Sequence, residues 1–132
     1  MLKKLSFYHG FINGLPDAHI SVKCIDDFKK VVRGYCYFNS ICILLRNSEG
    51  KLLNWLCLSE SDSLLTNLRN IFKAGIMTNT ISFDCILFRE SANPKKEDYQ
   101  LFRVMSDCGT LLGIYLDSVF VISLTDEKRI EV

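Results

Sequence analysis

Four residues near the amino terminus have side chains that could together perform acid–base or nucleophilic chemistry: His9, Asp17, His19 and Cys24. A thiol needs a neighbouring base to become a thiolate nucleophile, and a carboxylate can orient that base. Asp17 and His19 flank a turn predicted at residues 13–17, where such groups can meet. The same residue types are common in solvated hairpin turns that have no catalytic role. The spacing among the four residues does not match that of a known catalytic motif. The sequence therefore predicts no catalytic residue.

The six cysteines, at positions 24, 36, 42, 57, 85 and 108, are scattered, with no Cys-x-x-Cys pair among them. Most lie in apolar runs, where cysteine behaves as a small hydrophobe. This pattern predicts free thiols in a reducing cytoplasm rather than a disulfide framework or a zinc site. The pair Asp26–Asp27 is interpreted as a helix start, because adjacent helical residues diverge by about 100°. We expect no metal site and no cofactor.

Composition narrows the class of partner. The chain has 132 residues, is 48% hydrophobic and carries a formal net charge of +1. Nucleic-acid binding usually requires a clear basic excess, so we expect no nucleic-acid partner. We also see no signal peptide and no apolar run long enough to span a membrane, which predicts a cytoplasmic protein without membrane contact. The length fits a single globular domain over residues 1–132.

A predicted β-hairpin that is apolar on both faces is the strongest structural signal. Two apolar runs, residues 41–45 and 52–57, flank a turn at residues 47–50. If Arg46 pairs with Lys51, then Cys42 lies opposite Trp55. A hairpin with one solvated face would alternate apolar and polar side chains, and this one does not. Helices of the same chain or a partner must therefore cover each face.

The remaining elements are expected from periodicity, caps and turn residues. Strands are expected at 5–12, 18–24, 81–89 and 99–105, with one bent strand or two strands over 111–116 and 119–124. Helices are expected from Asp26 or Asp27 to Arg33, ended by Gly34, and from Ser59 or Ser61 to Ala74, ended by Gly75. Residues 91–98 form a polar loop, and 125–132 a charged tail with a short helical turn. The fold class is α+β: a mostly antiparallel sheet of five to seven strands with two main helices packed on it.

The order of helix, hairpin, helix and three strands over residues 26–124 resembles that of roadblock and profilin-like domains. The local likeness is residues 41–53, an apolar strand, the turn Asn47-Ser48-Glu49-Gly50 and an apolar return. The resemblance implies a scaffold subunit that self-associates through its sheet edge or a helix.

Three functions follow as hypotheses. The first is a non-enzymatic module that binds and neutralises or modulates one protein partner of unknown identity, as inhibitors and immunity proteins do. Its expected contacts are exposed aromatic and charged residues near the strand edges and the 91–98 loop: Tyr37, Arg89, Tyr99 and Arg103. The second is the self-associating scaffold, for example a homodimer. The third is a small enzyme that uses the His9–His19 turn. Trp55 is expected to be buried against Cys42 and the helix that ends at Ala74.

Overall fold

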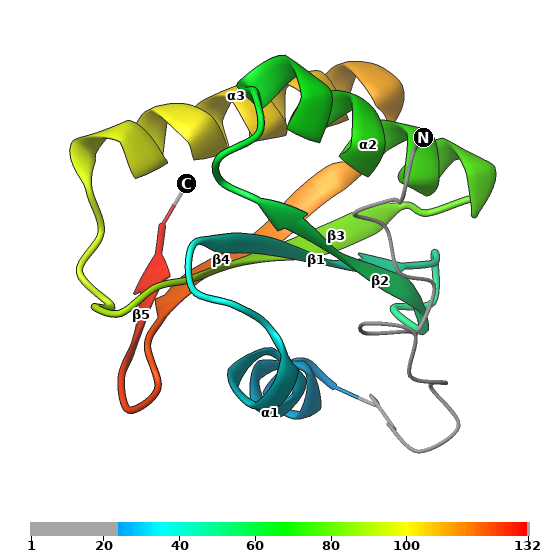
Figure 1. The fold of residues 1–132 in the computed structure, drawn as a ribbon. Helices are drawn as coiled ribbons and strands as arrows, with labels where there is room; N and C mark the ends of the chain where they lie inside the picture. Colours follow the sequence, from blue (N-terminus) through cyan, green and yellow to red (C-terminus); the bar gives the residue numbers. More distant parts are fainter. Residues whose placement is uncertain (1–23, 132) are drawn as a thin grey trace.

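The structure is a computed structural model that describes residues 24–131 (Figure 1). The strand expected at 5–12, most of the one expected at 18–24, and the group His9, Asp17 and His19 lie outside the described residues. The elements, in chain order, are α1 (Ile25–Tyr35), β1 (Ser40–Arg46), β2 (Leu52–Ser59), α2 (Leu64–Met77), β3 (Ser82–Phe88), α3 (Lys96–Leu112), β4 (Tyr115–Ile122) and β5 (Glu127–Ile130).

The five strands form one mixed sheet in the order β2-β1-β3-β4-β5. Only β3 and β4 run parallel, and the other neighbouring strands are antiparallel. Helix α1 covers one face of the sheet, and α2 and α3 cover the other (Figure 1). The predicted α+β class with a mostly antiparallel sheet is confirmed, but the described part holds three helices rather than two. None of the helices within residues 24–131 combines the length and the apolarity needed to cross a membrane.

The third helix corrects the strands expected at 99–105 and 111–116. Helix α3 begins at Lys96, where the Asp98 carboxylate accepts a 2.7 Å hydrogen bond from the Lys95 N–H. Its buried positions, Asp98, Phe102, Met105 and Gly109, recur at helical spacing on one face. Helix α3 provides the crossover connection that the parallel pair β3–β4 requires. The predicted order of helix, hairpin, helix and three strands, on which the resemblance to roadblock domains was based, is therefore wrong.

Both faces of β1 are buried, as its apolar pattern predicts, whereas β2 is buried at Trp55, Leu56 and Leu58 but exposes Leu53. Six of the seven residues of β1, from Ser40 to Leu45, are buried side by side. The expected register is shifted by two residues: Cys42 lies opposite Cys57, and Leu44 lies opposite Trp55. One residue of the shift arises because Asn47, not Arg46, closes the turn, with its N–H donating to the Lys51 carbonyl oxygen at 2.9 Å. The other arises from an irregularity in the pairing between Leu45 and Arg46. A shift of two residues keeps every side chain on its expected face.

Trp55 is buried, but against α1 rather than the helix expected over residues 61–74. Its ring centroid lies 5.9 Å from that of Phe28 in α1, and Cys42 and Leu44 belong to the same cluster. Helix α2 packs on the opposite face, against the odd-numbered residues of β1. Because successive side chains of a strand point to opposite faces of the sheet, the position of Trp55 in β2 directs its indole to the face that α1 covers.

Both boundaries of α1 and of α2 differ from expectation. Helix α1 begins at Ile25, which places Asp26 and Asp27 in its first turn, and it continues past Gly34. Ser63 caps α2, since its hydroxyl accepts a hydrogen bond from the Thr66 N–H at 3.1 Å. Helix α2 continues through Gly75 to Met77, and Gly75 packs closely against the side chain of Ile114.

The carboxyl-terminal segment forms strands. Strand β4 is one strand with an irregularity opposite Phe83–Asp84, and β5 replaces the expected helical turn. Two cations of α1 hold this region: Lys29 binds Glu127 at 2.8 Å, and Arg33 donates to the Ser123 carbonyl oxygen at 2.8 Å. These contacts join the first helix to the last hairpin.

Gly109 should not tolerate a methyl group, whereas Gly34 should. A Cβ on Gly109 would overlap the Ile114 carbonyl oxygen, but one on Gly34 meets nothing within 4 Å. We expect Gly109→Ala to destabilise the fold by about 1–3 kcal/mol and Gly34→Ala to be neutral or stabilising by up to about 1 kcal/mol. Urea unfolding of both variants measures the difference. Equal unfolding midpoints would contradict the close approach of α3 to the start of β4.

Trp55→Ala should cost on the order of 3–5 kcal/mol, because the indole fills the contact between β2 and α1. Leu53→Ala on the same strand is the control, since Leu53 is 39% exposed. Denaturant titration followed by circular dichroism gives both values. A Trp55→Ala protein with the wild-type midpoint would show that α1 does not depend on this contact.

Candidate protein-binding surface

The parallel pair β3 and β4 divides the molecule into two ends. Helix α2 leads into β3 and α3 leads into β4, so the carboxyl ends of both helices meet the amino ends of both strands. The loop after β3 and the turn after β4 lie together at the other end (Figure 1). In sheets with parallel strands, ligands usually bind at the carboxyl ends of the strands.

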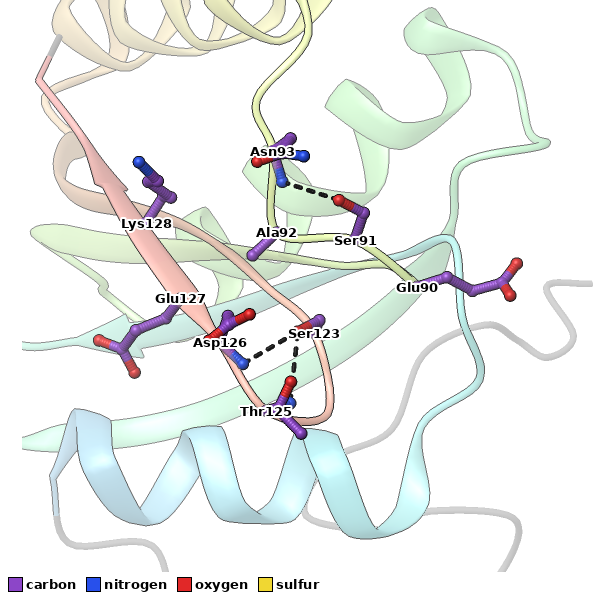
Figure 2. Close-up of a pocket in the computed structure, with 9 residues that line it drawn as sticks. All are labelled: Glu90, Ser91, Ala92, Asn93, Ser123, Thr125, Asp126, Glu127 and Lys128. Atoms are coloured by element: carbon purple, nitrogen blue, oxygen red, sulfur yellow. Dashed lines mark hydrogen bonds between the residues drawn. The ribbon is translucent and has the colours of Figure 1, made fainter.

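A polar pocket of about 310 Å³ lies at the carboxyl ends of β3 and β4 (Figure 2). The residues that line it are Glu90, Ser91, Ala92, Asn93, Ser123, Thr125, Asp126, Glu127 and Lys128. Ser123 organises the turn, because its hydroxyl accepts hydrogen bonds from the N–H groups of Asp126 and Thr125. Glu90 and Glu127 extend in opposite directions, and Glu127 is held by Lys29. Among the residues that line this pocket, no two carboxylates converge for acid–base catalysis.

Arg89 lies beside this pocket in a buried ion network. It is 7% exposed, so the expectation of an exposed Arg89 contact is wrong. Its guanidinium makes two hydrogen bonds to Asp98, at 2.6 and 2.7 Å, and two to Glu60, at 3.0 and 2.7 Å. These bonds raise the pKa of Arg89. Burial alone would raise the pKa of Asp98, but hydrogen bonds from Arg89 and the Lys95 N–H hold that pKa below its ordinary value.

The other three expected contact residues are exposed at the same end of the sheet. Tyr37 is 76% exposed in the segment between α1 and β1. Tyr99, 52% exposed, and Arg103 lie one turn apart on α3. They line a groove of about 280 Å³ that also contains Ile130 of β5. The topology therefore brings Tyr99 and Arg103 together, while Tyr37 follows α1. Their role in binding remains a prediction.

The opposite end of the molecule carries an exposed apolar surface, here named the apolar end patch. It consists of Ile76, Met77, Ile81, Leu111, Leu112 and Tyr115, each between 43% and 86% exposed. The Tyr115 N–H donates to the Ile81 carbonyl oxygen at 2.8 Å, which joins the two strand starts. Gly75 abuts Ile114, which joins the two helix ends. A contiguous group of large apolar side chains on a surface typically marks an interaction site.

Sequence reasoning missed this patch because two elements were assigned incorrectly. Ending α2 before Gly75 separated Ile76 and Met77 from the helix, and the strand expected at 111–116 assigned Leu111 to the sheet. The helical spacing of the buried positions of α3 was the available signal. No one-dimensional pattern brings the ends of two helices together, since their proximity depends on the parallel pairing of β3 and β4.

A third feature lies on the α1 face of the sheet, where three cysteine sulfurs gather. The Sγ of Cys36 lies 2.9 Å from that of Cys57 and 4.0 Å from that of Cys42, and Cys42 and Cys57 are 3.5 Å apart. Cys42 is buried, and the other two are partly exposed. Hydrogen bonds from Cys42 and Cys57 lower the pKa of Cys36 to about 5 and, with burial, raise those of the two donors. The spacing of the cysteines along the sequence had not indicated that Cys36, Cys42 and Cys57 lie together.

All six cysteines lie within residues 24–131, and none of them forms a disulfide bond in the structure. Their oxidation state in the protein as isolated stays a prediction.

Comparison with known proteins does not assign the chain to a group. No protein-family model matches it, and no curated protein matches it. Functional inference therefore depends on the two ends of the sheet and on the cysteine cluster.

The network around Arg89 should make stability sensitive to acid. Because the pKa of Asp98 in the folded state is below its ordinary value of 3.8, the unfolded state binds a proton first as the pH falls. The stabilisation is complete above that value and is lost below it. We expect Asp98→Asn to destabilise the protein at neutral pH and to flatten its loss of stability below about pH 4.

Urea unfolding at several pH values measures this effect. Glu97→Gln is the control, because Glu97 is an exposed acid in the same helical turn. An Asp98→Asn protein with the wild-type acid profile would show that the network does not govern acid unfolding.

Proposed function

We propose that this protein is a non-enzymatic binding module that holds one protein partner through the apolar end patch. The observation that carries the proposal is the exposure of six large apolar side chains at one end of a sheet whose two faces are already covered. The core does not need these side chains, so they are available to another molecule. Binding that neutralises or modulates the partner, as an inhibitor or immunity protein does, is the activity that best suits such a surface.

The make-up of the patch supports a specific interface. Met and Tyr are enriched in protein interfaces, and here Met77 and Tyr115 stand among aliphatic residues. The exposed polar residues Lys73, Asn79 and Thr110 adjoin them in sequence, as expected of the polar rim that surrounds an interface core. The patch is also held on helix ends and strand starts, so little conformational entropy is lost when it binds.

A second surface is supported by the groove between α3 and β5. Tyr99 and Arg103 line it, and aromatic and arginine residues often dominate binding energy. This surface is more polar than the apolar end patch, and Asp107 and Glu131 line it as well. The groove is the second candidate binding face, and exposed Tyr37, between α1 and β1, is tested with it as a further candidate contact.

Two other functions remain as alternatives. A self-associating scaffold would use the apolar end patch against a second copy, which requires a self-complementary, two-fold arrangement. An enzyme that uses the His9–His19 turn would place its chemistry outside residues 24–131. We expect no turnover on generic hydrolase or nuclease substrates.

Three variants with matched chemistry test the proposal. The patch variant is Ile76→Ser, Met77→Ser, Leu111→Ser. The control is Leu64→Ser, Leu65→Ser, Leu124→Ser, which removes three exposed aliphatic side chains outside the patch. The third variant, Tyr37→Ala, Tyr99→Ala, Arg103→Ala, removes the second face. Each is titrated against the protein captured by the wild-type chain from its native host, with thermal unfolding to verify the fold.

We expect the patch variant to bind at least tenfold more weakly, a loss of about 1.4 kcal/mol, and the control to bind like wild type. Loss of binding only in the third variant would move the site to the α3–β5 groove. Sedimentation of the wild-type chain as a dimer, dissociated only by the patch variant, would favour the scaffold. Unchanged partner binding in all three variants would show that neither the apolar end patch nor the α3–β5 groove is the binding site.

A further inference from the structure

The three sulfurs on the α1 face define a small site with ligand atoms from three elements. Cys42 and Cys57 are direct partners across the antiparallel pair β1–β2, so their side chains leave the sheet on the same face. Cys36 is the residue that ends α1, and its N–H donates to the Val32 carbonyl oxygen at 3.0 Å. Two strands and a helix end, rather than a loop, therefore position the sulfurs.

We infer that Cys36, Cys42 and Cys57 form a binding site for a single Zn²⁺ ion. The three Sγ atoms lie within 4.8 Å of one another, at separations between 2.9 and 4.0 Å. Four sulfurs about 2.3 Å from Zn²⁺ at the corners of a tetrahedron would lie roughly 3.8 Å apart. Small side-chain rotations therefore bring the three sulfurs to ligand distance, without a change in the strands.

The charge of the cluster favours a divalent cation. Cysteine binds a metal as the thiolate, so any proton on the three sulfurs passes to solvent when three zinc–sulfur bonds form. The product, three thiolates and Zn²⁺, carries one negative charge. A monovalent cation such as Cu⁺ on three thiolates would instead leave two negative charges in a largely buried site.

The partial exposure of the cysteine site allows a metal ion to enter, and its buried base shields the bound ion from solvent. Cys42 is fully buried at its base, whereas Cys36 and Cys57 are partly exposed. Phe28, Leu44 and Trp55 belong to the apolar cluster that includes Cys42. Three protein ligands leave the fourth tetrahedral position for water. A bound ion would tie the carboxyl end of α1 to the β1–β2 hairpin.

This inference does not depend on the proposed partner binding. The cysteines lie on the α1 face, and the apolar end patch lies at the ends of α2 and α3. Loss of zinc binding and loss of partner binding are separate measurements on separate variants, so each result stands alone.

Binding is tested on the full chain, reduced and freed of metal, with ZnCl₂ as the only added probe. Competition with a chromophoric chelator gives the affinity, and mass spectrometry under native conditions gives the stoichiometry. We expect one Zn²⁺ per chain and higher resistance to unfolding when the ion is bound. Co²⁺ in its place should give the absorption of a thiolate–metal bond.

Cys36→Ser and Cys57→Ser change the two partly exposed ligands, so their folds are the most tolerant of substitution. Each should weaken Zn²⁺ binding by at least tenfold and reduce the Co²⁺–thiolate absorption, since even the loss of a group that orients a ligand costs about 10–100-fold. The control Cys24→Ser, Cys108→Ser changes two thiols outside the cluster and should bind Zn²⁺ like wild type. Circular dichroism without metal verifies that every variant is folded.

Proton release gives an independent measurement. In weakly buffered solution at neutral pH, binding of Zn²⁺ should release protons from the cysteine ligands, and the affinity should increase with pH. Binding without proton release would overturn the three-thiolate site. Wild-type protein that binds only Cu⁺ would also overturn the zinc site. So would unchanged Zn²⁺ binding in the Cys36 and Cys57 variants. A disulfide among the three cysteines in protein isolated without oxidant would overturn it as well.

Discussion

Strands β1 and β3 bury side chains on both of their faces, and the rest of the molecule follows from the need to cover them. Residues Ile41 to Leu45 and Phe83 to Phe88 are all buried, so the sheet is the middle layer of three. The odd-numbered residues of β1 meet α2 and α3, and its even-numbered residues meet α1. Because burial of apolar surface is the largest favourable term in folding, no arrangement with one bare face would be stable.

Covering both faces restricts where function can lie. A sheet enclosed by helices exposes only its ends and its edge strands, and the apolar end patch and the groove beside β5 occupy these positions. The cysteine cluster lies where α1 ends and β1 begins, a boundary between layers. Each candidate site thus lies at the margin of the same packed core, on elements that the core holds rigid.

Buried ionic contacts specify this arrangement rather than supply its stability. Arg89 connects the end of β3 to Asp98 of α3 and to Glu60, and Lys29 connects α1 to Glu127 of β5. Desolvation offsets most of the attraction in such pairs. Their geometric requirement is strict, however, so a helix packed in a different position would leave a buried charge unpaired. The network therefore favours one placement of each helix over the alternatives.

How much was predictable differs from element to element. The double burial of β1, the two strands of the hairpin and the strand at 81–89 followed from local patterns, since alternation and apolar runs depend only on neighbouring residues. The helix over 96–112 had its own signal in the spacing of Phe102, Met105 and Gly109, yet the loose alternation of apolar and polar residues from Tyr99 to Met105 suggested a strand. Helix α2 was placed correctly but ended early, because Gly75 is conformationally ambiguous until its contact with Ile114 is known.

The sequence by itself determined that the sheet would be covered on both faces and which face each side chain of β1 would take, because these depend on a period of two along one strand. Only the tertiary structure decided that Trp55 meets α1, that Arg89 is buried between two carboxylates, and that six apolar residues gather at one end. Only it brought together Cys36, Cys42 and Cys57, because the register of the β1–β2 hairpin and the position of the end of α1 set the distances between their sulfurs. The other features require contacts between segments whose distance in space is set by strand order and by the parallel pair, and no local pattern contains that information.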